Sequence, residues 1–485
     1  MGSTLFIKGK QVIDSGRNIK AKSITIAGVG SCVPEMCIGK ILTPSTNIIL
    51  GNVDTDVNSF ADIYNVNNII IGEGAKGGFG NYAIALGKNS KVIDANYSIA
   101  IGGSSYVRNS DVIGSIAIGY RAAVHSYTNC ITIGQLSYTY GDNVIVIGGY
   151  AYAKNDAQNS VIIGTVSNGN RTFAANSAYN SVVIGSAACA NDDCSYCVVI
   201  GGRCVNSFSG RTYASGGCAG SVVIGSGAFV KQGCYNSVVL GKDAYVSGYN
   251  DSSNASVAIG YKTLVYGSAY SIALGSHYDG SSTYIGNSSY SLAIGCATSI
   301  YDSEGSVAIG YYAYAQSDSR NSVAIGNSAG TRNGSSSSVA VGADVYVSNS
   351  RFSVAIGCNF DGQRTRNLDS HYSVAIGSQS RNINAASSIA MGYSAYVNGV
   401  QNGIAIGVNA TVNVMNGISI GNGATTAAIA GSISINASGS SGNATPTVGY
   451  SLALGLGTGV QSGLNSSTRF LPVVINGGTY KLLIA

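Results

Sequence analysis

The stretch Ser322-Val323-Ala324-Ile325-Gly326 decides the fold, because close copies of it recur along most of the 485-residue chain. Aligned on their glycine, most successive copies are 14 to 17 residues apart, and a minority are 19 to 24 residues apart. Weaker copies end at Gly39 and Gly51, and a degenerate copy has Asn436 at the glycine position. Because Asn is the next most tolerant residue at positive φ, the glycine is predicted to serve a left-handed backbone turn. A repeat of this length indicates a solenoid.

Each copy is predicted to be a short β-strand. Side chains alternate along a strand, so Val323 and Ile325 share one face and Ala324 lies on the other. A second short strand is expected three to five residues after the glycine, as in Ala313-Tyr314-Ala315. Two strands and two turns per repeat predict an all-β parallel β-roll, or solenoid. About 24 coils at ~4.8 Å each would form a rod roughly 115 Å long.

The face that carries Ala324 stays small and uncharged, whereas a solvated face would carry Lys, Glu or Thr. Small side chains in a column allow another backbone to approach closely, and a coil this thin has too little interior to be stable alone. Self-association through this face is therefore predicted, with three chains in a homotrimeric fibre. The predicted trimer interface consists of Ala117, Ala258, Ala273, Ala293, Ala308, Ala324, Ala355 and Ala375.

Aromatic residues recur four residues after the repeat glycine, and they are predicted to align along one edge of the stacked coils. The main interpretation is a structural ladder of neighbouring rings, worth ~0.5–1 kcal/mol per pair. The alternative is a lateral platform for sugars or other fibres, since exposed aromatics mark interaction surfaces. This aromatic column consists of Phe229 and the candidate surface-binding residues Tyr106, Tyr138, Tyr152, Tyr245, Tyr314, Tyr346 and Tyr396.

Three long coils are further candidates for binding, because extra residues in a solenoid must leave it as loops, often on the binding face. They span residues 164–185, 201–225 and 357–377. The third contains four charged residues, Asp361, Arg364, Arg366 and Asp369.

Composition narrows the possible partners. Charged residues make up 10% of the chain and hydrophobic residues 45%, which is not the composition of a disordered protein. The net charge is +5 without a Lys/Arg-rich run, so the electrostatic footprint of a nucleic-acid-binding protein is missing. No stretch approaches the roughly 20 apolar residues of a membrane-spanning helix, so no membrane insertion is expected.

The 11 cysteines are irregularly spaced, and they are expected to be reduced in a protein made in the cytoplasm. Cys194 and Cys197 form a C-x-x-C pair, but a zinc site needs a second spaced pair. Cys130 and Cys197 each stand where serine opens a repeat. No metal or cofactor is therefore predicted, with a zinc or redox site as the alternative.

No catalytic residue is predicted, so the protein is not expected to be an enzyme. A glycosidase would need paired carboxylates in a groove, and the nearest acidic neighbours are Asp192 with Asp193 and Asp302 with Glu304, all in expected turns. The histidines are more than 90 residues apart, and a metal held by three copies of one of them on a three-fold axis is the alternative. These histidines are His125, His277 and His371.

The segment Ser322 to Ala329, Ser-Val-Ala-Ile-Gly-Asn-Ser-Ala, resembles the head repeat of trimeric autotransporter adhesins, the YadA-like head. The resemblance covers residues 69–455 and implies a trimeric left-handed parallel β-roll. The chain departs from that family at its ends. Its first residues lack the apolar core of a signal peptide, and neither a heptad stalk nor the alternating strands of a membrane anchor is recognisable.

The ends resemble segments of bacteriophage structural proteins. Residues 12–19 look like a short segment common in such proteins, and residues 471–483 are similar to the terminal hairpins of phage tail and fibre proteins. These resemblances imply a virion fibre, assembled in the host cytoplasm, which binds a host surface glycan or protein and is joined to tail or baseplate proteins. The alternatives are a bacterial cell-surface trimeric adhesin exported by an unusual route and an ice-binding solenoid, which would need a regular Thr array.

Four segments are expected along the chain. They are an N-terminal attachment segment over residues 1–35, irregular lead-in coils over 36–68, the repeat β-roll over 69–455 and a C-terminal hairpin cap over 456–485.

Overall fold

The computed structural model describes residues 67–421, apart from 79, 126, 155, 168, 203–210, 249–252 and 360, together with the backbone of five strands outside that range. Every described element is a β-strand, which confirms the all-β prediction. The chain divides into two units, Met1–Ala427 and Ala428–Ala485, which are described separately.

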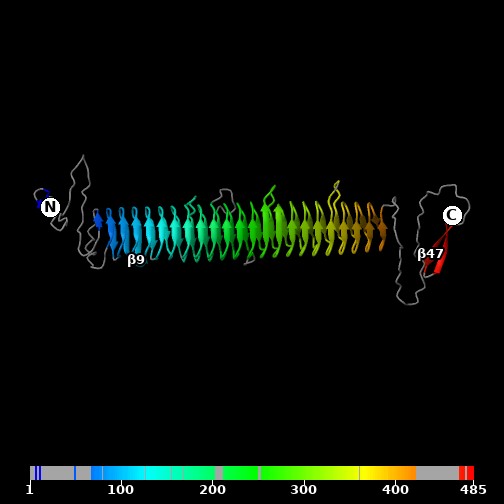
Figure 1. The fold of residues 1–485 in the computed structure, drawn as a ribbon, viewed down its shortest axis with the longest axis horizontal. Coiled ribbons are helices and arrows are strands. Elements are labelled where there is room, and N and C mark those ends of the chain that lie inside the picture. The colour runs from blue at the N-terminus through cyan, green and yellow to red at the C-terminus, as the bar shows by residue number, and fades with distance from the viewer. Residues whose placement is uncertain are drawn as a thin grey trace, which may run out of the picture. The chain divides into compact units, whose positions relative to one another are not determined.

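In the first unit the strands alternate between two parallel sheets (Figure 1). Even-numbered strands from β4 onward form the first sheet, odd-numbered strands from β5 (Lys76–Gly78) to β45 (Thr411–Val412) form the second, and each strand pairs in parallel with the next strand of its own sheet. The predicted parallel β-solenoid is confirmed. The second sheet contains twenty-one strands, so the stack is about 100 Å long at ~4.8 Å per coil.

The strands of the first sheet mark the repeats, and most have three residues. Their bounds are β4 (Ile69–Ile71), β6 (Ile84–Leu86), β8 (Ile99–Ile101), β10 (Ile116–Ile118), β12 (Ile131–Ile133), β14 (Ile145–Ile147), β16 (Val161–Ile163), β18 (Val182–Ile184), β20 (Val198–Ile200), β22 (Val222–Ile224), β24 (Val238–Leu240), β26 (Val257–Ile259), β28 (Ile272–Ser276), β30 (Leu292–Cys296), β32 (Val307–Ile309), β34 (Val323–Ile325), β36 (Val339–Val341), β38 (Val354–Ile356), β40 (Val374–Ile376), β42 (Ile389–Met391), β44 (Ile404–Ile406) and β46 (Ile418–Ile420).

The repeat glycine is required by its conformation and by its neighbour in the next coil. Gly310 has a φ of +137°, and a Cβ built on it would lie 2.3 Å from the carbonyl oxygen of Gly326. The positive φ predicted from the sequence is confirmed. Any side chain here would therefore meet both backbone strain and a collision between stacked coils.

The interior between the two sheets is filled by small side chains. Ala324 of the first sheet and Ala315 of β33 (Tyr314–Gln316) in the second are both completely buried in the single chain. All eight alanines predicted to form the trimer interface lie at 0% exposure, so that prediction is wrong. The close approach that their size permits is to the second sheet of the same chain. These residues are Ala117, Ala258, Ala273, Ala293, Ala308, Ala324, Ala355 and Ala375.

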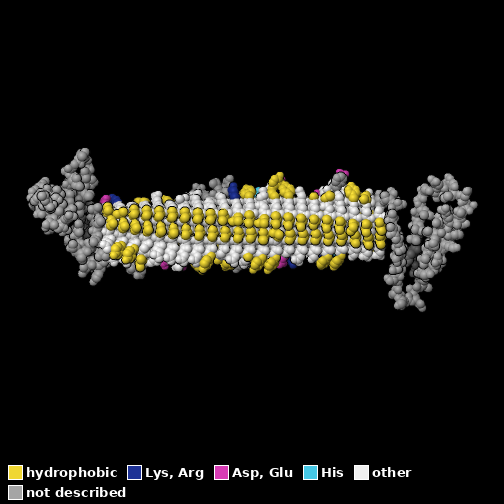
Figure 2. Space-filling view, in the orientation of Figure 1, with side chains coloured by type: hydrophobic (Ala, Val, Ile, Leu, Met, Phe, Trp, Pro, Cys, Tyr) yellow, Lys and Arg dark blue, Asp and Glu magenta, His cyan; other side chains and the backbone are white. Residues whose placement is uncertain are grey.

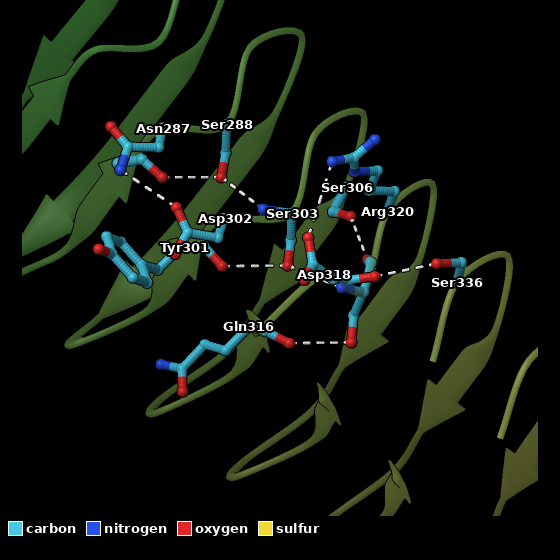
Figure 3. Close-up of polar contacts among 12 residues, drawn as sticks. Asn287, Ser288, Tyr301, Asp302, Ser303, Ser306, Gln316, Asp318, Arg320 and Ser336 are labelled. Carbon is cyan, nitrogen blue, oxygen red and sulfur yellow. Dashed lines mark hydrogen bonds and ion pairs between the residues drawn. The ribbon is translucent and has the colours of Figure 1, made fainter. Parts of the chain in front are cut away.

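Buried serines at the turns tie successive coils together. The Ser306 hydroxyl donates to the carbonyl oxygen of Ser319 at 2.8 Å and accepts the backbone N–H of Ser322 at 3.2 Å. A second serine column does the same nearby, where Ser303 donates its backbone N–H to the Ser288 hydroxyl at 2.8 Å (Figure 3). These columns satisfy buried backbone groups that the strand ladders leave unpaired.

Short strands lie outside the repeats. β3 (Ile48–Leu50) pairs in parallel with β4, so part of the expected lead-in segment adds a strand to the first sheet. β1 (Phe6–Ile7) and β2 (Lys10–Gln11) pair antiparallel. In the second unit, β47 (Arg469–Ile475) and β48 (Gly478–Ile484) form the hairpin predicted for the C-terminal segment. The expected repeats beyond residue 421 lie outside the described residues.

Candidate functional site

The outer face of the first sheet is a continuous apolar surface. In each first-sheet strand from β4 to β46 the first and third residues point outward, and every one of them is Ile, Val, Leu or Met. We call these residues the aliphatic face, and Figure 2 shows them as two unbroken hydrophobic rows along the solenoid. Ile325 and Ile356 keep 38% and 39% of their surface exposed although both are flanked by neighbouring coils. The sequence had placed the small residues outward, and the structure reverses the two faces.

The outer face of the second sheet has a different character. It carries charged side chains such as Lys154 of β15 (Tyr152–Lys154) and Lys231 of β23 (Phe229–Lys231), mixed with polar and aromatic residues. The two faces belong to the same coils, so their difference reflects their surroundings rather than the fold. The second sheet is suited to solvent, and the aliphatic face is suited to contact with another protein surface.

The aromatic column predicted from the sequence is confirmed as one register position of the second sheet. Tyr213, Phe229 and Tyr245 stack ring on ring, with centroids 5.1 Å and 4.7 Å apart. Phe229 and Tyr346 are buried, and burial raises the pKa of Tyr213 to about 12. Such packing fits a structural ladder, and the use of the column as a sugar platform stays a prediction.

A second set of aromatics is exposed, and it was not predicted from the sequence. Tyr97, Tyr290 and Tyr372 stand directly before a repeat serine and are 59%, 64% and 63% exposed. Each has a φ between 53° and 59°, where Asn stands in many other coils. Phe352 stacks on Tyr372 at 5.2 Å. An aromatic residue at this Asn position is the sequence feature that could have revealed them.

The three histidines lie apart from the aliphatic face. The His125 ring stacks on Tyr140 at 4.4 Å and hydrogen-bonds the Tyr106 hydroxyl through Nε2. Burial lowers the pKa of His125 to about 4. His277 contacts the Ser282 hydroxyl at 3.1 Å, and His371 accepts the backbone N–H of Arg351 at 2.9 Å. Each histidine is thus engaged within its own chain, and none lies among the outward residues of the first sheet.

Most of the cysteines in the solenoid interior occupy serine positions. Cys197 is a free cysteine, and its thiol donates a hydrogen bond to the carbonyl oxygen of Cys218 at 3.0 Å, as the hydroxyl of a repeat serine does. Burial raises the pKa of the Cys189 thiol to about 11. Within residues 67–421, as far as they are described, no group of three or more His, Cys, Asp or Glu side chains is placed to hold a metal ion. Cys204 lies outside the described residues.

The acidic residues Asp192 and Asp302 have a structural role in the turns. Asp192 accepts hydrogen bonds from the side chains of Asn176, Asn191 and Ser215. Asp302 accepts one from Asn287 at 3.1 Å, across two stacked coils (Figure 3). These carboxylates cross-link adjacent coils, and their contacts account for their positions without a substrate.

Comparison with protein families identifies the repeat. The model of the YadA head domain repeat matches residues 80–105, 303–329 and 401–424. These three segments are YadA-type head repeats. The three matches fall near the start of the solenoid, about two thirds of the way along and at its end, and the same two-stranded coil continues through the segments between them. No curated protein matches the chain. In the described part of the chain, no helix is long and apolar enough to cross a membrane.

Proposed function

We propose that this protein is a non-catalytic, adhesin-like surface fibre, in which three chains associate through the aliphatic face. The observation that carries this proposal is the unbroken apolar surface over all first-sheet strands from β4 to β46. An exposed apolar patch of this extent exceeds what soluble monomers tolerate. Cyclic self-association covers one such face per chain with identical copies, and the YadA-type repeats favour three chains.

Light scattering on the purified full chain tests the oligomeric state. A mass three times the chain mass of 49.1 kDa is expected. A stable monomer would contradict the proposal, because its aliphatic face would then be exposed to water.

We further propose that the fibre belongs to a virion, as a tail fibre or similar appendage. Its partners would be tail or baseplate proteins and a host surface glycan or protein. The resemblance of residues 12–19 and 471–483 to phage structural proteins supports this assignment. The YadA-type repeats also support a bacterial cell-surface adhesin. Mass spectrometry of purified virions and of the outer surface of uninfected host cells separates the two, because the protein should be found in only one of these fractions.

A further inference from the structure

An arginine-rich site lies on the outer face of the second sheet, away from the aliphatic face. Its residues come from successive strands of this sheet, β35 (Gly330–Arg332), β37 (Tyr346–Ser348), β39 (Arg366–Leu368), β41 (Arg381–Ile383) and β43 (Tyr396–Asn398). The strand register places Tyr346, Arg366, Arg381 and Tyr396 side by side in one column. Arg364 joins them from the long coil of residues 357–377.

The guanidinium groups surround two tyrosine rings. Those of Arg332, Arg364 and Arg366 lie 5.3, 5.7 and 5.8 Å from the centroid of the Tyr346 ring. The guanidinium of Arg381 lies 4.6 Å from the centroid of the Tyr396 ring. Arg366 also donates through Nη1 to the Tyr346 hydroxyl at 2.8 Å. The rings thus hold four cations on one small area of a chain whose charged fraction is only 10%.

The positive charge of this site is not balanced by the described residues. Asp344 pairs with Arg364 at 3.0 Å, and no carboxylate in the described part of the chain pairs with Arg366 or Arg381. These two arginines lie directly opposite each other on neighbouring strands, where like charges destabilise a sheet. The Nε atoms of both are buried and have no hydrogen-bond partner. An anion between the two guanidiniums would remove the repulsion.

We propose that Arg366 and Arg381, with Arg332 beside them, bind the anionic groups of an acidic polysaccharide. A planar guanidinium matches a carboxylate, sulfate or phosphate group through two parallel hydrogen bonds. Neighbouring coils present such groups about 4.8 Å apart on a rigid face, which suits closely spaced anionic groups. The inference rests on the proposed adhesive function, because it names the ligand class that the fibre would recognise.

Nucleic acid is the less suitable polyanion. Binding to a nucleic acid depends on a long row of phosphate contacts, and the unpaired guanidiniums here span only a few coils. Tyr346 is only 7% exposed, so it offers no open ring on which a base could stack.

The test measures binding of immobilised trimer to dextran sulfate and polygalacturonate, with neutral dextran as the uncharged control and duplex DNA as the competing class. Both acidic polysaccharides should bind and neutral dextran should not. Arg366→Gln with Arg381→Gln should weaken binding by at least roughly tenfold, as expected for the loss of two charge-assisted hydrogen bonds. The matched control Lys154→Gln with Lys231→Gln removes two cations from the same outer face and should change binding by less than about twofold.

Arg366→Lys with Arg381→Lys keeps the charge and loses the paired hydrogen bonds, and it serves if the glutamine variant fails to fold. It should also weaken binding, by a smaller factor. The inference would be overturned if neither acidic polysaccharide bound. It would also be overturned if the Arg366/Arg381 glutamine variant and the Lys154/Lys231 control lost binding equally, or if DNA bound more tightly than the polysaccharides. Light scattering of the same samples reports separately on the trimer, so a monomer that still binds polyanions would reject the proposed assembly and retain this site.

Discussion

Charged residues placed in the aliphatic face should dissociate the fibre. The variant carries Ile309→Lys, Ile325→Lys and Val341→Lys, three neighbours in one outward row of β32, β34 and β36. In the single chain about a third of Ile325 remains exposed, at 38%. Since full burial of such a side chain stabilises by ~1.5–3 kcal/mol, covering the remainder on association contributes ~0.5–1 kcal/mol per residue.

Summed over the two outward residues of each first-sheet strand from β4 to β46, this amounts to at most roughly 20–40 kcal/mol per chain before the cost of association, because most of these residues are less exposed than Ile325. Each buried, unpaired lysine costs about 3–5 kcal/mol, and a trimer of the variant holds nine of them around one axis. Per chain, the three lysines cost about 9–15 kcal/mol, which together with the cost of association removes most of this gain. The expected result is monomer at micromolar concentration, with β-structure retained.

Sedimentation and light scattering measure the mass, and circular dichroism measures the fold. The matched control, Ser299→Lys with Gln316→Lys and Asn398→Lys, places three lysines on the outer face of the second sheet and should remain trimeric. A lysine variant of the aliphatic face that keeps the mass and melting temperature of the wild type would refute the reasoning.

Substitution of the buried alanines distinguishes the two faces of the first sheet. Ala308→Leu, Ala324→Leu and Ala355→Leu add volume between the two sheets of one chain, at a cost of ~1–3 kcal/mol per site. The solenoid itself should therefore melt earlier, whereas the lysine variant should lose association first. Melting curves at several protein concentrations separate these effects, because only dissociation depends on concentration.

Four further outcomes are expected. Ser306→Ala should destabilise by about 1–3 kcal/mol in thermal melts, because the backbone N–H of Ser322 is left buried without a partner, and Ser306→Cys should cost less. The free energy of unfolding should fall as the pH drops from about 6.5 toward 4 and then level off. The reason is that His125 binds a proton in the unfolded chain over this range, whereas in the folded chain its pKa is lowered to about 4. His125→Tyr should flatten this part of the stability curve. Deletion of residues 463–485 should give trimers of mixed register or aggregates, and a homogeneous wild-type-like trimer on a gel-filtration column would argue against this. Serine at five buried cysteines should leave the melting temperature within a few degrees, with no zinc in elemental analysis. These cysteines are Cys189, Cys194, Cys197, Cys218 and Cys234.

The repeat predicted the fold well because its spacing leaves little choice. A glycine at positive φ in most coils and two short strands between glycines allow a parallel stack and little else, and Gly310 shows why no other residue serves. The stack also aligns residues at equal distances from the glycine, which is why Phe229 and Tyr245 could be predicted to lie in one column. Tyr213, twelve residues after Gly201, joins the same column through a longer coil and was not predicted.

Alternation along a strand does not say which face is inside. Ala324 and Ile325 are both apolar, and which of them lies inside depends on the distance between the two sheets, which the turns set. Tight turns hold the two sheets close together, so the interior is filled mainly by Ala and Val, with Ile at only a few positions such as Ile162, Ile285 and Ile300. The column of alanines was therefore correctly predicted to make a close contact. That contact is with the second sheet of the same chain and not with another chain.

The arginine site could not be assembled from the sequence because the coils differ in length. Tyr346 and Arg366 are direct neighbours although they are 20 residues apart, whereas Arg366 and Arg381 are neighbours at 15. The loop of residues 357–377 absorbs the difference. The number of residues between them does not show that Arg366 lies beside Tyr346 rather than beside another residue of the adjacent coil.

Register is specified within a chain and left open between chains. Inside the solenoid, the side-chain amide of buried Asn382 donates a hydrogen bond to the side-chain oxygen of Asn367 at 2.8 Å. On the next strands of the same column, Val347 lies beside Asn367 and Val397 lies beside Asn382. A slip of one coil would set an amide against valine and leave a buried polar group unpaired, so the chain marks its own register. The aliphatic face has no such mark, because every coil presents a similar pair of aliphatic residues. Two chains could slide by one coil and lose only the contacts at their ends. Alignment of the trimer must therefore come from a non-repeating segment, and the hairpin of residues 469–484 is the one whose strands the structure shows paired over their full length.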